Sequence, residues 1–216
     1  MFEGTKYFYV HPTGDSSIAL ARPDKWTASD TWLCGECNSP RPGTQELDLR
    51  TSNVQVPRDP LSFVTAGMVG VGRRELFADM GWEEVSRDLF LGKLIAVSDP
   101  KLFEGWVTFR GRYPIIVRGL REAGYRVCGT CGRVAYFAYD DSYLYPRPEE
   151  GVDIFDASGG RLIVTEKIAR RIDLSKWQRV ELDEIPVLDK PVDEFDELVS
   201  LYMPIGTPPR KRAPDT

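Results

Sequence analysis

Short apolar runs, rather than long helical stripes, dominate the pattern of hydrophobic positions along the chain. Residues 6–10 combine aromatic and β-branched side chains and predict a strand, which we expect to end in a turn at His11 and Pro12. Residues 18–21 are its expected hairpin partner. Further strands are predicted at residues 89–97, 106–109, 113–117, 126–128, 134–139, 153–155, 162–164 and 179–182.

Two segments have the spacing of an amphipathic helix instead. In residues 73–82 the apolar positions Leu76, Phe77 and Met80 fall on one face before a helix-breaking glycine, and residues 165–172 show a similar pattern. Residues 59–63 are expected to be a loop that enters a short helix. The glycine-rich residues 67–72 lack the Lys-Ser/Thr of a phosphate-binding loop, so they indicate a flexible loop or tight packing.

These elements predict an α/β (α+β) fold, with a mixed, largely antiparallel sheet and a few helices. We expect a single domain over residues 1–205, from which a middle lobe of about residues 45–120 projects. Residues 206–216 are polar and proline-rich, and they predict a disordered tail.

The net charge and the absence of long apolar runs make some partners and compartments less expected than others. No apolar run approaches the roughly 20 residues of a membrane span, and the N-terminal residues lack the pattern of a signal peptide. We therefore predict a cytoplasmic protein with no membrane partner. The formal net charge of −5 disfavours nucleic acid as a partner and favours a basic protein. These features leave a homo-oligomer open.

All four cysteines fall into two matched pairs, Cys34/Cys37 and Cys128/Cys131, each in a Cys-Gly-x-Cys turn. Such a turn can place two thiolates at adjacent corners of a tetrahedron, so two turns together predict one structural Zn2+ per chain with four cysteine ligands. Ninety residues separate the turns, so this zinc-knuckle clasp would join distant segments. A thioredoxin-like redox site, two surface disulfides and a degenerate site without metal are the alternatives.

Catalysis has little support in the sequence. His11 is the sole histidine, so any triad would have to include it, and we interpret it as a turn residue rather than a general base. A closed site of four thiolates would offer no open metal position for chemistry. We therefore expect no enzymatic activity.

The most acidic stretch lies near the C-terminus, where apolar residues stand between the acids. Its residues from 181 to 197 include one lysine only. Acidic stretches are most often solvated faces, but apolar residues beside the charge can also form the core of a docking surface. The candidate partner-binding residues are Asp183, Glu184, Asp189, Asp193, Glu194, Asp196 and Glu197.

The residues around the cysteine turns resemble the double-CxxCG motif family of myxobacterial proteins. The similarity rests on residues 32–37, on residues 126–133, and on residues 153–157 with 162–169, which are similar to the family's "DlF" strand and the helix after it. The middle lobe matches only loosely. One departure is Asn38, which stands where the family usually has glycine.

The resemblance implies a non-enzymatic immunity protein. The family is associated with immunity to swarming-inhibition toxins, which neighbouring cells exchange, so the implied partner is one cognate toxin protein bound stoichiometrically. The alternative is a zinc-ribbon adaptor that binds nucleic acid or a transcription complex. That alternative predicts a basic face around the cysteine turns, where the sequence has only Arg126 and Arg133.

Overall fold

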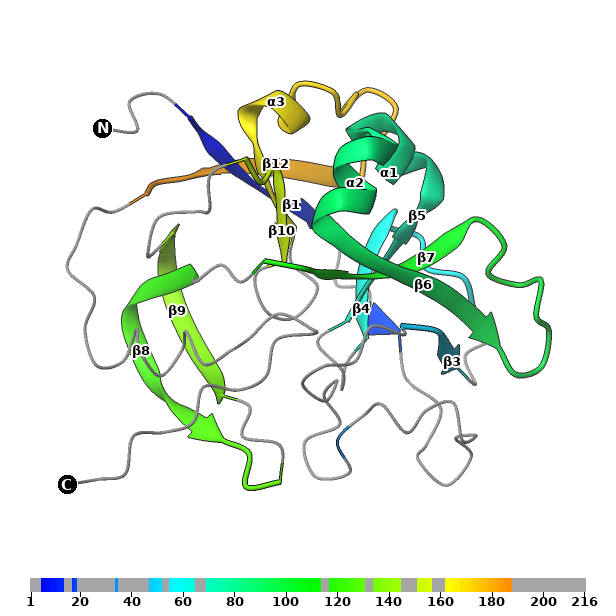
Figure 1. Cartoon of the computed structure of the whole chain (residues 1–216), viewed down its shortest axis with the longest axis horizontal. Helices are drawn as coiled ribbons and strands as arrows, with labels where there is room; N and C mark the ends of the chain where they lie inside the picture. The colour runs from blue at the N-terminus through cyan, green and yellow to red at the C-terminus, as the bar shows by residue number, and fades with distance from the viewer. Residues whose placement is uncertain are drawn as a thin grey trace.

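Two mostly antiparallel β-sheets and a separate two-stranded ribbon form the body of the protein (Figure 1). The computed structural model describes residues 5–13, 17–18, 34, 47–51, 55–64, 69–113, 117–130, 134–144, 151–156 and 162–187. In this part of the chain the fold is of the mixed α+β kind, with three short helices.

The first sheet brings together the two ends of the described chain. Its strand order is β10-β11-β1-β12, and all neighbours are antiparallel. The strands are β10 (Ile154–Asp156), β11 (Leu162–Thr165), β1 (Tyr7–Pro12) and β12 (Val180–Ile185). The predicted strand at residues 6–10 is therefore confirmed, as are those at residues 153–155, 162–164 and 179–182.

The second sheet has six strands in the order β2-β4-β5-β7-β6-β3, and it is parallel only at its two outer pairs. The strands are β2 (Ser17–Ile18), β4 (Leu61–Val64), β5 (Gly70–Arg73), β7 (Trp106–Gly111), β6 (Leu89–Ala96) and β3 (Leu49–Thr51). The predicted strands at residues 89–97 and 106–109 correspond to β6 and β7.

The ribbon consists of β8 (Val117–Val127) and β9 (Val134–Leu144), which pair with each other in antiparallel register. It confirms the hairpin predicted around the second cysteine turn and extends it to eleven residues in each strand. The predicted strand at residues 113–117 overlaps β8 only at Val117, because Tyr113 lies in a bend and residues 114–116 fall outside the described part.

Two of the predicted elements are wrong, and the pairing of the strands explains both. Residues 18–21 were expected to form a hairpin with β1, but Ile18 lies in β2, which pairs with β4, and residues 19–21 fall outside the described residues. Residues 59–63 were expected to lead into a helix. They contribute to β4, which β5 holds in an antiparallel ladder.

The helices lie beside the junction of the two sheets (Figure 1). The helix predicted at residues 73–82 is confirmed as α1 (Arg74–Met80), and a second helix, α2 (Trp82–Asp88), follows it directly. Gly81 joins them with a φ of 107°, a value that favours glycine. The second predicted helix is shorter than expected: α3 covers Glu166–Ala169 and continues only as hydrogen-bonded turns.

The two sheets share one hydrophobic core. It includes Val10 and Val164 from the first sheet, Phe109 from the second, and Phe77 and Ile168 from helices α1 and α3, all buried. Several described residues of the expected middle lobe, among them Leu61, Phe77 and Phe109, thus pack against the first sheet. A second cluster, which includes Val71 and Phe103, fills the far side of the six-stranded sheet. The domain limits at 205 and 206 remain predictions.

Close packing explains two glycines of the 67–72 segment. A Cβ at Gly70 would collide with the ring of Phe109, and a Cβ at Gly72 would lie 2.6 Å from Phe77 Cε2. Of the two interpretations of this segment, tight packing is confirmed at Gly70 and Gly72. Within the part of the chain that the structure describes, no helix is long and apolar enough to cross a membrane.

Candidate metal centre and acidic sheet edge

One cysteine from each turn meets the other in the folded chain. The Sγ atoms of Cys34 and Cys128 are 3.8 Å apart, although 94 positions separate the residues. Both residues are buried, with 0% and 6% of their surface exposed. The structure therefore brings one cysteine of each pair together, as the metal hypothesis requires.

The ribbon delivers Cys128 to this meeting point. Strand β8 ends at Val127, so Cys128 is the first residue of the turn that leads towards β9, and Gly129 and Thr130 after it are exposed. Cys37 and Cys131 fall outside the described residues. Among those that are described, no third histidine, cysteine or carboxylate joins Cys34 and Cys128 in a group that could hold a metal ion.

The distance between the two sulfurs fits shared zinc ligation. Two thiolates, each about 2.3 Å from one tetrahedral zinc, lie about 3.8 Å from each other. A disulfide would need about 2.05 Å, so Cys34 and Cys128 are not joined in this way. A hydrogen bond between the two sulfurs fits the same distance, and a metal assay is needed to choose between the two.

Two of the seven candidate partner-binding residues lie at the edge of the first sheet. Asp183 and Glu184 are neighbours on β12, where their side chains are 68% and 53% exposed. The other five, Asp189, Asp193, Glu194, Asp196 and Glu197, fall outside the described residues. The first residues of the acidic stretch thus belong to a strand at the edge of the first sheet.

Basic groups on and beside β1 already contact these carboxylates. Nε2 of His11 lies 2.8 Å from Asp183 Oδ2 and 3.9 Å from Glu181 Oε2, and Lys6 Nζ lies 2.9 Å from Glu184 Oε2. The bond to Glu184 raises the pKa of Lys6. The expected negative charge is therefore partly balanced within the protein.

The sequence suggested that His11 lies in a turn, and this prediction is wrong. It belongs to β1, and its ring stacks on Tyr9 with 5.0 Å between the ring centroids. Strand β11 pairs with β1 only as far as Val10, so from His11 onward β1 has a strand on one side only. A proline is tolerated there because no partner needs its missing N–H.

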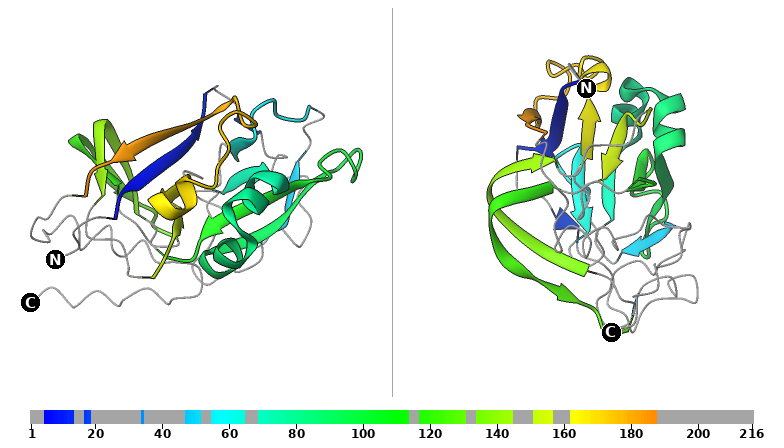
Figure 2. Two further views of the ribbon diagram at one scale, coloured as in Figure 1. Left: turned by 90° about the horizontal axis from the view of Figure 1, so that it is seen from above. Right: turned by 60° about the vertical axis from the view of Figure 1, so that its left-hand side comes forward.

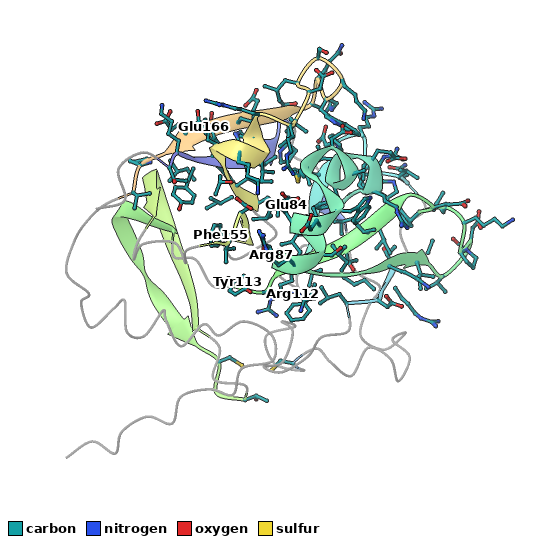
Figure 3. The ribbon with its side chains drawn as sticks, turned by 45° about the horizontal axis from the view of Figure 1, so that its top comes forward. Glu84, Arg87, Arg112, Tyr113, Phe155 and Glu166 are labelled. Carbon is teal, nitrogen blue, oxygen red and sulfur yellow. The ribbon has the colours of Figure 1, made fainter. Side chains whose placement is uncertain are left out.

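The sequence interpretation missed a cluster of six charged residues that joins α2, β10 and α3. Its members, which we call the charge cluster, are Glu84, Arg87, Asp88, Asp153, Lys167 and Arg171. Figure 3 shows Glu84 and Arg87 on the α2 side that faces β10. The spacing of Glu84, Arg87 and Asp88 along one helical turn was a signal that could have indicated a shared face.

Asp88 is the most deeply buried member of the cluster, with 0% of its surface exposed. Its carboxylate accepts two hydrogen bonds from the Arg87 side chain, at 2.6 and 2.8 Å. It also accepts the backbone N–H groups of Asp153 and Ile154, at 2.8 and 3.0 Å. Because each oxygen has a donor, this buried charge is satisfied and fixes β10 against α2.

Asp153 and Glu84 accept the remaining cations. Burial would raise the pKa of Asp153, but hydrogen bonds from Lys167, Arg87 and Thr165 outweigh it and hold that pKa below its usual value. Hydrogen bonds from Arg171 and Lys167 lower the pKa of Glu84 to about 2. The three anions and three cations thus balance one another and link α2 to the segments that contain β10 and α3.

The chain matches no model of a known protein family. No curated protein matches it significantly either.

Proposed function

We propose that the two cysteine turns hold one structural zinc ion through Cys34, Cys37, Cys128 and Cys131. The observation that carries this proposal is the 3.8 Å separation of Cys34 and Cys128, which is the spacing of two ligands on one tetrahedral zinc. The sequence supplies a second cysteine three positions after each of them. Four thiolates would close the coordination sphere, so the metal's role is to cross-link the ribbon to the N-terminal part of the chain.

We further propose that the clasped protein is an immunity protein, which neutralises one cognate toxin by stoichiometric binding and without turnover. The resemblance around the cysteine turns to the double-CxxCG family supports this function. Two features of the structure agree with it: buried charges in the charge cluster are mutually satisfied, and the sole histidine lies against carboxylates of a sheet edge. The charge cluster uses its carboxylates to bind its own cations, and the exposed carboxylates of β12 suit contact with a basic partner.

Co-expression tests the immunity function. The product of each gene adjacent to this one is expressed in a bacterial host, alone and together with this chain. We expect one product to arrest growth, this chain to restore growth, and the two proteins to co-purify in equal amounts. Failure to protect against any toxic neighbour would contradict the proposal and favour the zinc-ribbon adaptor, which would instead retain nucleic acid or a transcription complex on purification.

A further inference from the structure

Among the described residues, β12 has a paired strand on one edge only, so its outer edge is available for pairing with another strand. All six residues of β12 pair with β1, and in the described part of the chain no other strand pairs with it. In Figure 2, β12 lies beside β1 at the margin of the first sheet, whose order is β10-β11-β1-β12. Strand β9 approaches β12, but its pairing partner is β8. The free edge presents main-chain N–H and C=O groups of the kind that accept an added strand.

The side chains along this edge select a basic occupant. Glu181 and Asp183 alternate along β12, and the register places them opposite His11 and Tyr9 on one face of the sheet. Their side chains are 57% and 68% exposed. Glu184 points to the other face, where Lys6 balances it. An incoming lysine or arginine would therefore meet two exposed carboxylates beside the stacked rings of Tyr9 and His11.

The same charges disfavour a second copy of this chain as the occupant. If two β12 strands paired with each other, the carboxylates of one strand would face those of the other across the new ladder. Like charges opposite each other destabilise a strand pair. Charged side chains also protect edge strands from self-association. The carboxylates of β12 should therefore disfavour pairing with a second β12 and favour pairing with a cationic strand.

We propose that β12 receives an extended, lysine- or arginine-rich segment of the toxin as a fifth strand of the first sheet. The toxin segment would gain main-chain hydrogen bonds from the edge, and Glu181 and Asp183 would supply specificity for its cations. This inference rests on the proposed immunity function and assigns its binding surface. It places that surface on two ordered residues, Glu181 and Asp183, in addition to the acidic positions further along the chain.

A model strand tests the surface without the toxin. The probe is a ten-residue peptide of alternating arginine and valine, and its control replaces each arginine with glutamate. By NMR, we expect the arginine peptide to shift the amide signals of residues 180–185 and slow their hydrogen exchange, and the glutamate peptide to do neither. Ordinary exchange at β12 with saturating arginine peptide would overturn the proposal, because charge attraction alone leaves the edge amides exposed to solvent.

Matched charge reversals test the specificity. Glu181→Lys with Asp183→Lys should weaken binding of the arginine peptide at least about tenfold, since two attractive ion pairs are lost and the reversal adds repulsion. Glu83→Lys with Glu104→Lys makes the same change in net charge at exposed residues elsewhere and should leave the affinity within about twofold. Equal weakening by both pairs would show a non-specific charge effect and contradict the proposal.

The toxin assay separates this surface from the function. If the doubly reversed β12 variant loses protection while the control pair keeps it, the surface and the function both hold. If the β12 variant still protects and co-purifies with the toxin, the function stands and the surface is wrong. Peptide binding at β12 in a protein that protects against no neighbour would instead leave the edge as a basic-strand site and contradict the immunity function.

Discussion

At the residue scale, Asp88, the last residue of α2, links that helix to the chain around β10 through hydrogen bonds to its carboxylate. It is fully buried and accepts hydrogen bonds from one arginine and from two backbone N–H groups of another segment. A buried carboxylate is tolerated only where donors satisfy it in this way. Asp88 therefore determines where the chain before β10 can lie.

Replacing Asp88 with asparagine tests that role. Asp88→Asn keeps the shape but turns an N–H2 group towards donors and leaves the Arg87 guanidinium without its closest anion. We expect a loss of about 2–4 kcal/mol in the free energy of unfolding, measured by urea denaturation. The control is Glu83→Gln on the same helix, where the side chain is exposed and the change should stay within about 0.5 kcal/mol. Similar small losses in both variants would contradict a structural role for Asp88.

Gly70 is a second residue whose identity is dictated by a neighbour. Adding a methyl group there forces the Phe109 ring, which is fully buried and packs edge-to-face on Phe77, out of its position. We expect Gly70→Ala to cost about 1–3 kcal/mol, measured by thermal and urea unfolding. Adding Phe109→Leu to Gly70→Ala should cost less than the sum of the two single changes, because the smaller side chain makes room. Strict additivity would show that the two residues do not collide.

At the element scale, the charge cluster joins α2 to β10 and α3, and it makes this junction sensitive to acid. The pKa of Glu84 falls from an ordinary 4.5 to about 2 on folding, and that of Asp153 is lowered as well. Groups with lowered pKa values in the folded state stabilise it above their unfolded pKa, and this contribution is lost as the pH falls through the folded value. The loss should therefore occur between about pH 4.5 and pH 2.

Glu84→Gln should flatten this acid dependence. Lys167 and Arg171 are partly exposed, so we discount the contribution of Glu84 to about 2 kcal/mol. Urea unfolding at a series of pH values measures it. Between about pH 6 and pH 3, we expect the wild-type protein to lose more stability than the variant. Parallel profiles for the two proteins would show that Glu84 gains nothing from its cations in the folded state.

The elements themselves could be predicted where a local pattern was sufficient. Most strands could be predicted from the pattern of apolar residues, and helix α1 from the spacing of its apolar residues and from Gly81, which ends it. The exceptions depend on partners far away in sequence. Residues 61–64 form a strand because β5 lies beside them, and Ile18 pairs with β4, a partner more than 40 residues away in the sequence. No window of the sequence contains that information.

In the candidate site, too, some features could be predicted from the sequence and others depend on contacts between distant residues. The paired spacing of the cysteines predicted that distant turns would meet, and Cys34 and Cys128 do. The charge cluster could not be predicted, because its anions and cations come from three segments that only the fold brings together. The acidic stretch could be recognised from composition, yet its pairing with Lys6 and His11 depends on the register of β1 and β12.

At the scale of the whole molecule, the two sheets form a core without the cysteines. The main hydrophobic clusters combine residues of both sheets and helices α1 and α3, and neither Cys34 nor Cys128 belongs to them. The ribbon, by contrast, pairs with no other strand in the described part of the chain. The clasp should therefore matter most for the ribbon and less for the sheets.

If the proposed zinc ion holds the ribbon, removing it should separate these two parts. After treatment with a strong zinc chelator under reducing conditions, we expect the amides of β8 and β9 to exchange with solvent much faster, and those of β5, β6 and β7 to keep most of their protection. Hydrogen-exchange mass spectrometry resolves the two regions. Complete unfolding of the protein, or no change in the ribbon, would each contradict this division.

The central claim is that two cysteine turns share one zinc ion, and native mass spectrometry of the freshly purified, reduced protein tests it most directly. We expect one zinc per chain, lost when the Cys34→Ser and Cys128→Ser changes are combined. A metal-free chain carrying four free thiols, or a chain with its cysteines joined in disulfides, would contradict the claim.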